Sequence, residues 1–375
     1  MISLNENLST LQRSGIRRFT NMAREVTDCV MLTIGEPDLD TPEPIKAAAA
    51  AALADNQTHY APNQGILPLR QAVADFETAR GMACTADQVL ITVGATGALF
   101  TALLGILNPG DEVIIPTPAF SLYETIAMVA GAKVVPLDLT KTGFQITDEA
   151  LSACLSEKTK AIVLNSPNNP TGTVLNEASL EAVKRAAAAR DFYIICDNVY
   201  NQLVWGPCPD LSLDAALADK VLLCQSFSKP YAMTGWRVGY LVGPQAVMDR
   251  LLLLHAAQVA AVPTFLQTAC ITALQTDISE MREIYRLRRE FVVSRLREMG
   301  LSFPEPAGAF YVFVDIRRFG LTSENFCARA IRQAAVAMVP GSCFGAEGYV
   351  RLSCCCSMDD LARGMDRLED FLCRL

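Results

Sequence analysis

Lys229 lies in a segment whose residue types are suited to covalent chemistry. The segment, residues 226–237, reads SFSKPYAMTGWR and contains two serines, the lysine and an arginine. Apolar runs at 221–225 and 238–242 flank it, and each is typical of a short buried strand. Pro230 disfavours helical backbone at the preceding lysine, so we expect an extended or turned loop between the two strands.

The amine of Lys229 and its neighbours suit two tasks on one ligand. The amine can form a Schiff base with an aldehyde, and Ser226, Ser228 and Arg237 can hold a phosphate through directional hydrogen bonds. Pyridoxal phosphate (PLP) carries both groups. A surface lysine in a polar loop is the ordinary alternative, because most lysines are exposed. The loop alone leaves the two interpretations open.

An acidic residue at the end of an apolar run is a second candidate. Residues 192–197, FYIICD, are typical of a buried strand that ends at Asp197. A carboxylate in that place is costly unless it meets a cation, and the protonated pyridine nitrogen of PLP is such a cation. An aspartate that caps a turn is the alternative.

Two turns that follow predicted strands are rich in small or polar residues. Residues 89–93 predict a strand, and the Gly-Ala-Thr-Gly run at 94–97 opens a helix whose free N–H groups and dipole favour an anion. Residues 161–164 predict a strand that runs into NSPNNPTG at 165–172, a stretch too turn-rich to be core. Ligands of parallel sheets gather beyond the carboxyl ends of the strands.

Gly35 and Arg351 are further candidates for ligand contacts. Gly35 follows a short predicted strand and can offer its N–H at close range because it has no side chain, although an ordinary turn glycine is the preferred interpretation from the residues alone. Arg351 lies in a predicted strand at 349–353, and its planar fork matches a carboxylate. A surface arginine on an edge strand is the alternative.

The alternation of strands and helices from residue 89 to 242 predicts an α/β fold with a mostly parallel mixed sheet flanked by helices. Helices are predicted at 44–54, 67–79, 147–155, 177–190, 251–257, 265–275 and 279–299. Beyond the last of these the pattern changes to α+β. We therefore predict a large domain at 43–280 and a smaller domain built from 1–42, a partly helical arm, and 281–375.

The composition limits the partners. The 375 residues are enough for two domains, and a net charge of −8 without a basic stretch argues against nucleic acid and anionic membranes. The N-terminal residues lack a signal-peptide arrangement, and the apolar windows are too short to span a bilayer. Thirteen scattered cysteines without a C-x-x-C pair, and only two histidines, predict reduced thiols in a cytoplasmic protein and no metal site.

The motifs, taken in order, resemble those of the class I/II aminotransferases, which are PLP-dependent enzymes of fold type I. The matching segments are I-G-E-P-D at 34–38, Y-A-P-x-x-G at 60–65, P-N-N-P-T-G at 167–172, S-F-S-K-x-Y-x-M-T-G-W-R at 226–237 and R-L-S at 351–353. The resemblance covers residues 30 to 360, and the lysine and Asn-Pro segments are its most specific parts.

The resemblance assigns most of the candidates to the cofactor. Lys229 holds PLP as a Schiff base, Asp197 pairs with the pyridine nitrogen, and Tyr200 reaches the phenolic oxygen. The phosphate ligands are Ala95, Thr96, Ser226, Ser228, Arg237 and, from a second subunit, Tyr60. Phe120 falls where the family places a tryptophan or tyrosine against the cofactor ring, and a core phenylalanine is an equal alternative. The contribution of Tyr60 implies a homodimer.

The resemblance also predicts the substrate contacts. Gly35, Asn169 and Arg351 meet the substrate carboxylate, and Asn169 lies beside the phenolic oxygen as well. Thr96 occupies a position where one subgroup that uses aspartate and prephenate carries a lysine. Its absence favours an aromatic, aliphatic or other amino donor.

The chain departs from the family pattern in two places. Asn198 replaces the usual glutamate of D-E-x-Y, which spares both ligands of that motif and removes a charge. Three cysteines, Cys354–Cys356, replace a small residue and an aromatic after R-L-S. Three adjacent thiols on an extended chain converge poorly on one metal ion, so this departure concerns side-chain specificity.

The implied activity is the transfer of an amino group from an L-amino acid to a 2-oxo acid, 2-oxoglutarate, by a ping-pong mechanism. Lys229 acts as the general acid–base at the substrate Cα. A PLP-dependent carbon–sulfur β-lyase on the same fold is an alternative, although M-T-G-W-R favours a transaminase. The PLP-sensing domain of a transcription regulator is a further alternative, and it is disfavoured because the motifs begin near residue 30 without a basic module ahead of them.

Overall fold

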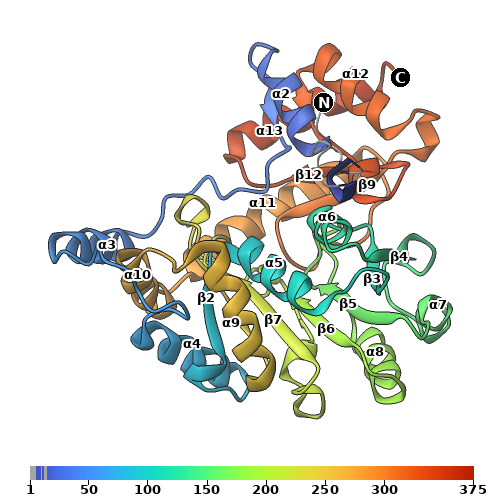
Figure 1. The fold of residues 1–375 in the computed structure, drawn as a ribbon. Coiled ribbons are helices and arrows are strands. Elements are labelled where there is room, and N and C mark those ends of the chain that lie inside the picture. Colours follow the sequence, from blue (N-terminus) through green and yellow to red (C-terminus); the bar gives the residue numbers. More distant parts are fainter. Residues whose placement is uncertain (1–5, 10, 12–14) are drawn as a thin grey trace, which may run out of the picture.

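A seven-stranded sheet forms the centre of the computed structural model, which describes residues 6–9, 11 and 15–375 (Figure 1). Only β8 runs antiparallel to its neighbours, so the predicted mostly parallel mixed sheet is confirmed. In spatial order the strands are β2 (Val89–Thr92), β8 (Gly239–Val242), β7 (Val221–Ser226), β6 (Tyr193–Asp197), β5 (Thr159–Asn165), β3 (Glu112–Thr117) and β4 (Lys133–Asp138).

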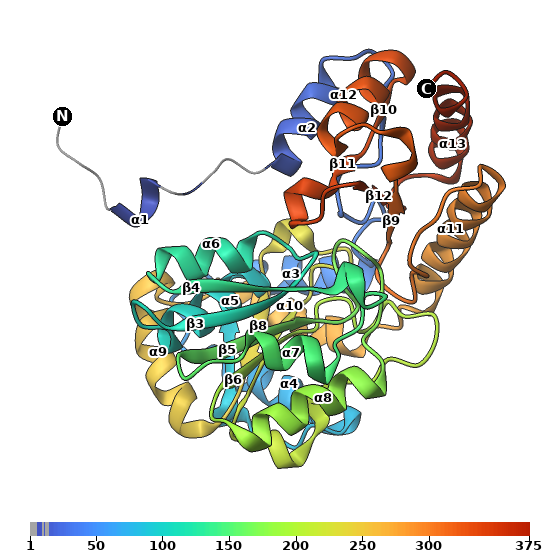
Figure 2. The same cartoon turned by 90° about the vertical axis from the view of Figure 1, so that its right-hand side faces the viewer.

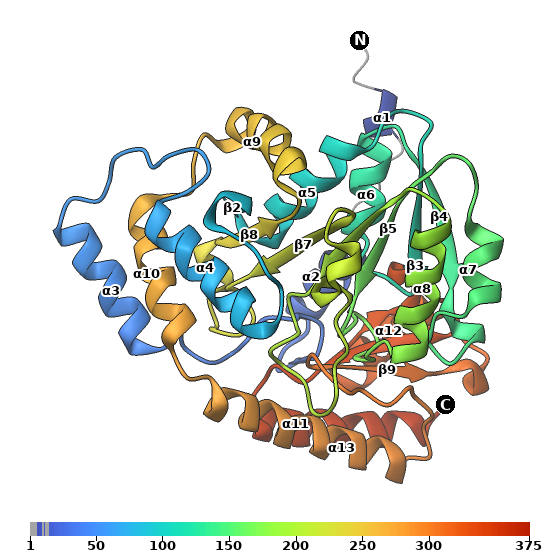
Figure 3. The same ribbon diagram turned by 90° about the horizontal axis from the view of Figure 1, so that it is seen from below.

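Helices cover both faces of the sheet, because successive strand residues point to opposite sides and both sets are apolar. Val113 and Ile115 pack with one group of helices, whereas Ile114 packs with the other. The first group is α5 (Gly94–Ile106), α6 (Leu122–Val129) and α9 (Gln245–Val259). The second group is α3 (Glu43–Ala54), α4 (Leu67–Arg80), α7 (Asp148–Cys154), α8 (Glu177–Ala189) and α10 (Thr264–Gln275), and Figures 2 and 3 show the layers from two further sides.

A second, smaller part lies beside the carboxyl ends of the sheet strands (Figure 2). Its antiparallel sheet has the order β11 (Val339–Pro340), β12 (Tyr349–Ser353) and β9 (Tyr311–Asp315). The strand β1 (Val30–Met31) pairs with β10 (Val336–Ala337), so an N-terminal segment and a C-terminal segment of the chain both belong to this part. The helices of this part are α2 (Gly15–Arg24), α12 (Ser323–Ala334) and α13 (Met358–Leu372), and α11 (Ser279–Glu298) connects it to the larger part.

Most predicted elements appear within a few residues of their expected bounds. The helix predicted at 251–257 is longer and spans Gln245–Val259, because its first turns carry polar residues that an apolar run does not reveal. The strand predicted at 238–242 begins at Gly239, since Arg237 before it has left-handed backbone with φ +57°. The short helix α1 (Glu6–Ser9) contacts α6, where the side chain of Asn7 donates to the carbonyl of Val129 at 3.2 Å. Within residues 6–9, 11 and 15–375, no helix is both long and apolar enough to cross a membrane.

The loop that follows β5 packs directly against the small part. The N–H of Gly308 donates to the carbonyl of Gly172 at 2.9 Å. Gly172 has φ +71°, and a Cβ on it would lie 2.5 Å from the carbonyl oxygen of Tyr311 and 2.7 Å from Pro306. A side chain therefore has no room at this junction.

Gly172→Ala is expected to lower the free energy of unfolding by about 2–4 kcal/mol, because a left-handed alanine is strained and its Cβ must displace backbone. Gly143→Ala is the matched control. Gly143 has φ +65°, but a Cβ on it would meet nothing within 4 Å, so only the conformational cost of about 1 kcal/mol applies. Chemical denaturation of both variants measures the difference. Equal losses would contradict the close packing at Gly172.

Candidate active site

Lys229 follows strand β7 and points toward the loop after β1. Its Nζ donates a hydrogen bond to the carbonyl of Gly35 at 2.6 Å and lies 5.9 Å from the ring centre of Phe310. Loss of hydration around the amine lowers the pKa of Lys229 to about 8. A larger fraction of this amine is therefore neutral, and hence nucleophilic, at physiological pH than in an exposed lysine.

Asp197 ends strand β6 and is 3% exposed. Burial raises the pKa of its carboxyl to about 6, although hydrogen bonds from Tyr123 and from the N–H of Val199 oppose the rise. The hydroxyl of Tyr123 donates to Oδ2 at 2.6 Å. Asp197 forms no ion pair among the described residues, and a buried carboxylate of this kind is stabilised by a positively charged partner in contact with it.

Asn198, which replaces the usual glutamate, has a local explanation. Its side-chain amide donates to Oδ2 of Asp210 at 2.9 Å. Asp210 also lies 3.7 Å from Arg80 in an ion pair. A glutamate at position 198 would bring a second negative charge to Asp210, whereas the amide gives it a donor.

The predicted phosphate ligands surround the beginning of helix α5. The N-cap residue of this helix, Val93, gives it no side-chain hydrogen bond, so the N–H groups of Ala95 and Thr96 in the first turn can bind a ligand. A Cβ on Gly94 would lie 2.8 Å from Nη2 of Arg237, which places the guanidinium against the helix end. The buried hydroxyls of Ser226 and Ser228 lie 2.9 Å apart beside it. Backbone donors, hydroxyls and a cation at one helix end suit a phosphate.

Arg351 is 2% exposed and meets two of the other candidate segments. Its Nη1 donates to Oδ1 of Asn169 at 2.7 Å, and its Nη2 donates to the carbonyl of Thr33. Its Nε is buried without a hydrogen-bond partner among the described residues. An unpartnered donor on a buried guanidinium fits a carboxylate that is not part of the chain.

Tyr200 and Tyr311 form a pair that sequence reasoning covers only in part. Their hydroxyl oxygens are 2.9 Å apart, and burial raises the pKa of Tyr200. Sequence reasoning misses Tyr311 and Tyr123 because each contacts its partner across a long sequence separation. Tyr123 stands three residues after Phe120, which is the one local signal for it. Tyr311 lies in an apolar strand that is typical of core.

Three of the predicted cofactor ligands are less enclosed. Phe120 is half-buried, and its ring meets Tyr123 edge-on with centroids 6.0 Å apart. Tyr60 is 93% exposed in the loop between α3 and α4, so a single chain does not enclose it. Thr96 is also exposed. The predicted roles of these three residues depend on groups outside one chain.

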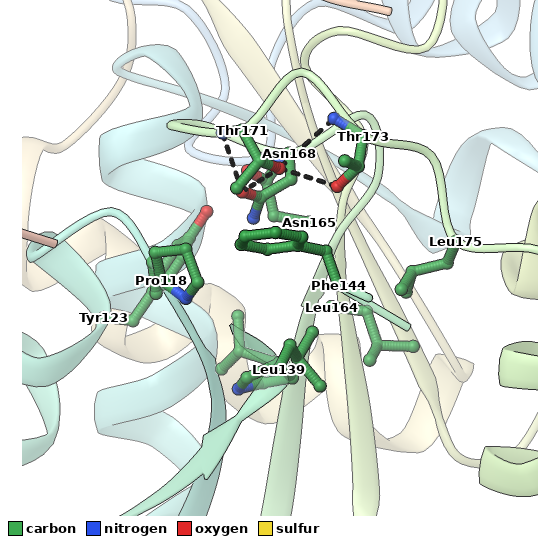
Figure 4. A pocket seen from close by; sticks show the side chains of 13 residues that line it. Pro118, Tyr123, Leu139, Phe144, Leu164, Asn165, Asn168, Thr171, Thr173 and Leu175 are labelled. Carbon is green, nitrogen blue, oxygen red and sulfur yellow. Dashed lines mark hydrogen bonds between the residues drawn. The ribbon is translucent and has the colours of Figure 1, made fainter. Parts of the chain in front are cut away.

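A narrow cavity lies beside Tyr123 and the loop after β5. Figure 4 shows Pro118, Phe144 and Leu139 along it, with the hydrogen-bonded Asn168, Thr171 and Thr173 at one end. About 20 Å³ of it is open to water, which is room for a water molecule or two rather than for a substrate. The residues that surround Lys229 remain the better candidate for chemistry.

The donor set around Lys229 fits PLP. The uncapped helix with Arg237 suits the phosphate, the Asp197 carboxylate suits a protonated pyridine nitrogen, and the amine of Lys229 suits the aldehyde. The described residues contain no cluster of three or more histidine, cysteine or acidic side chains placed for a metal ion. The fold and the site together place this protein in the fold-type-I class of PLP-dependent enzymes.

Comparisons with known proteins agree. The family model "Aminotransferase class I and II" matches residues 27–368, and the chain belongs to that family. A probable N-acetyl-LL-diaminopimelate aminotransferase from Bacillus subtilis is 40% identical, with 98% of this chain and 95% of that protein covered. An aspartate aminotransferase from Pyrococcus horikoshii is 38% identical, with 98% and 96% covered. The solved Thermus thermophilus aspartate aminotransferase with maleate has a TM-score of 0.94 at 35% identity and covers 99% of this chain and 100% of its own. The chain is therefore a PLP-dependent aminotransferase.

Asp197→Asn is expected to remove a pH-dependent loss of stability from the cofactor-free protein. The carboxyl has a pKa of about 6 in the fold against an ordinary value of 3.8. Below pH 3.8 the carboxyl makes its full contribution to the free energy of unfolding. This contribution, about 3 kcal/mol, is lost as the pH rises through about 6. Denaturation at several pH values should show that the free energy of unfolding of the variant rises relative to that of the parent over this pH range.

Asp55→Asn serves as the control, because Asp55 is exposed at the end of α3. The difference from the parent should change more with pH for Asp197→Asn than for this control. If Asp197→Asn behaves in the same way, the carboxyl is ionised in the fold without cost, and the burial argument is wrong.

Proposed function

We propose that this aminotransferase moves the amino group of an L-amino acid to 2-oxoglutarate by a ping-pong mechanism, with PLP held covalently by Lys229. The observation that supports Lys229 is its poorly hydrated amine, with a pKa of about 8, at the sheet edge beside Gly35 and Asp197. When bound, PLP supplies an electron sink for charge that develops on the substrate Cα.

The other cofactor contacts follow from the same edge of the sheet. Asp197 accepts from the protonated pyridine nitrogen and keeps it charged, while Tyr123 orients the carboxylate. Tyr200 and Asn169 donate to the phenolic oxygen, and Phe120 packs on the ring face. The phosphate is held by Ala95, Thr96, Ser226, Ser228 and Arg237.

The substrate is fixed by its carboxylate. Arg351 supplies the charge, and Asn169 and the N–H of Gly35 supply neighbouring polar contacts. Lys229 then takes the proton from Cα and returns it on the cofactor side, and its pKa of about 8 lies near the working pH, as a general acid–base requires. Fixing the carboxylate orients the Cα–H bond, which favours proton removal over decarboxylation.

A homodimer would complete the site. Large apolar side chains are exposed on α3, α4 and α9 and on the loop between the first two. These three helices lie toward the same side of the ribbon in Figure 1. These side chains are Leu53, Tyr60, Leu67, Leu253 and Val259. Exposed apolar groups that gather on one face mark a contact surface. We propose that a second chain covers this face and that Tyr60 reaches the partner's phosphate.

The cellular setting and the domain limits are also proposals. All thirteen cysteines are free thiols, which supports a reducing, cytoplasmic location. Two apolar clusters lie within the large part, and a third lies mainly in the small part, which supports a large domain at 43–280 and a small domain from 1–42 and 281–375. Residues 1–5, 10 and 12–14 of the predicted arm lie outside the described residues.

Spectra of the PLP-loaded protein test the activity and name the donor. Relatives of similar identity are named for aspartate, for aromatic amino acids and for N-acetyl-LL-diaminopimelate, so the donor is an outcome of the test. The true donor should convert the absorbance of lysine-bound PLP to that of pyridoxamine phosphate, and 2-oxoglutarate should restore it. Release of pyruvate and ammonia with unchanged absorbance would instead indicate a β-lyase. Lys229→Ala should abolish the lysine-bound absorbance.

Hybrid dimers test the contribution of Tyr60. Lys229→Ala and Tyr60→Ala chains carry different tags, are co-expressed, and are purified through both tags. If Tyr60 acts in the partner's site, each hybrid contains one site with both residues intact and recovers about half of the parent activity. Hybrids no more active than the mean of the two variants would place Tyr60 in its own chain's site or outside any site.

A further inference from the structure

Tyr311 touches three of the groups that the proposed function assigns to cofactor and substrate. It lies on β9 and is 2% exposed. Its hydroxyl is 2.9 Å from that of Tyr200, and its ring centre is 4.5 Å from the guanidinium carbon of Arg351. A Cβ on Gly35 would lie 1.7 Å from its hydroxyl oxygen, so the hydroxyl also lies against that backbone.

The ring of Tyr311 helps to fix Arg351. The guanidinium carbon lies 4.9 Å from the ring centre of Phe344, in the turn that precedes β12, so two aromatic rings contact the guanidinium. Stacking on aromatic rings is favourable for arginine and limits its rotation. Its two Nη atoms already have partners within the chain, and its Nε has none among the described residues. The ring therefore helps to hold the guanidinium in the orientation that a carboxylate meets.

The hydroxyl of Tyr311 faces the other way, toward Tyr200. Either oxygen can donate in the pair as it stands. Once Tyr200 donates to the phenolic oxygen of PLP, its one proton is used, and Tyr311 must become the donor to Tyr200. A hydroxyl that accepts a hydrogen bond is a stronger donor, because bonds in a chain polarise one another.

We propose that Tyr311 is a positioning residue that couples the carboxylate-binding Arg351 to Tyr200 at the phenolic oxygen. The proposal rests on the proposed roles of those two residues. The titratable or charged groups around Tyr311 are Arg351, Tyr200 and Cys355. Burial raises the pKa of Tyr311 to about 12, and the positive charge of Arg351 opposes the rise. That charge makes the Tyr311 hydroxyl a better donor, and a carboxylate on Arg351 weakens the effect.

Tyr311→Phe tests the coupling through the absorbance of lysine-bound PLP as the pH changes. Loss of the proton from the Schiff base between Lys229 and PLP leaves more negative charge on the phenolic oxygen. Weaker donation from Tyr200 stabilises that charge less, so the pH midpoint of the absorbance change should rise by about 0.5 pH unit. Propionate, a carboxylate without an amino group, should raise the midpoint of the parent as well. In Tyr311→Phe the propionate-induced shift should fall to half or less.

Tyr349→Phe is the matched control. Tyr349 also lies under an arginine, with the Arg317 guanidinium carbon 5.4 Å from its ring centre, but away from the lysine. The pH midpoint of the Tyr349→Phe variant, and the shift of that midpoint by propionate, should equal those of the parent. If Tyr311→Phe also matches the parent in both, the hydroxyl coupling is wrong.

Tyr311→Leu tests the ring. Loss of one aromatic face should raise KM for the amino donor about tenfold, with a smaller change in kcat, whereas Tyr311→Phe should keep KM close to the parent value. Melting curves show whether each variant remains folded. Unchanged KM in a folded Tyr311→Leu variant would overturn the role of the ring. If the parent itself forms no lysine-bound absorbance with PLP, it is the proposed role of Lys229 that fails, and not the role of Tyr311.

Discussion

The amine of Lys229 is held in poorly hydrated surroundings without a carboxylate ion pair in the part of the chain that the structure describes. It donates to a backbone carbonyl instead, which lies 2.6 Å away. A lysine that only stabilised the fold would gain more from an acidic partner, because an isolated buried charge is costly. The arrangement therefore gives a larger fraction of neutral amine than an exposed lysine has, and the neutral amine is the form that can attack an aldehyde. Asp197 is likewise buried, and its carboxyl accepts a hydrogen bond from the phenol of Tyr123.

The fold makes this arrangement possible by placing both groups where parallel strands end. The middle residues of β5, β6 and β7 are apolar on both faces, and each strand ends in a polar residue at the same edge of the sheet. These end residues are Asn165, Asp197 and Ser226. The small part of the chain then covers that edge and supplies Arg351 and Tyr311. The lysine and the other proposed cofactor contacts thus come from the large sheet, whereas the proposed contact with the substrate carboxylate comes mainly from the small one. A substrate that binds both must hold the two parts together.

The sequence predicted those features that depend on local order. Apolar runs that end in Asp197 and in the lysine loop mark strand ends, and the carboxyl ends of parallel strands must meet. The positions of Tyr123 and Tyr311 could not be predicted in this way. Tyr123 is 74 residues from Asp197, and Tyr311 is 111 residues from Tyr200. Such pairs depend on how two sheets and their loops pack, which no local pattern specifies.

In the proposed site the two phenols have different consequences, because they would act at opposite ends of the cofactor ring. Tyr123 donates to the carboxylate of Asp197, which would face the pyridine nitrogen, and this hydrogen bond lowers the pKa of Asp197 against the effect of burial. Tyr200 would donate at the phenolic oxygen, with Tyr311 behind it. Hydrogen-bond donors at both ends stabilise negative charge at both ends, whereas charge on the substrate Cα is stabilised by a positively charged nitrogen. Tyr123 therefore helps to keep Asp197 ionised, and an ionised Asp197 keeps that nitrogen protonated.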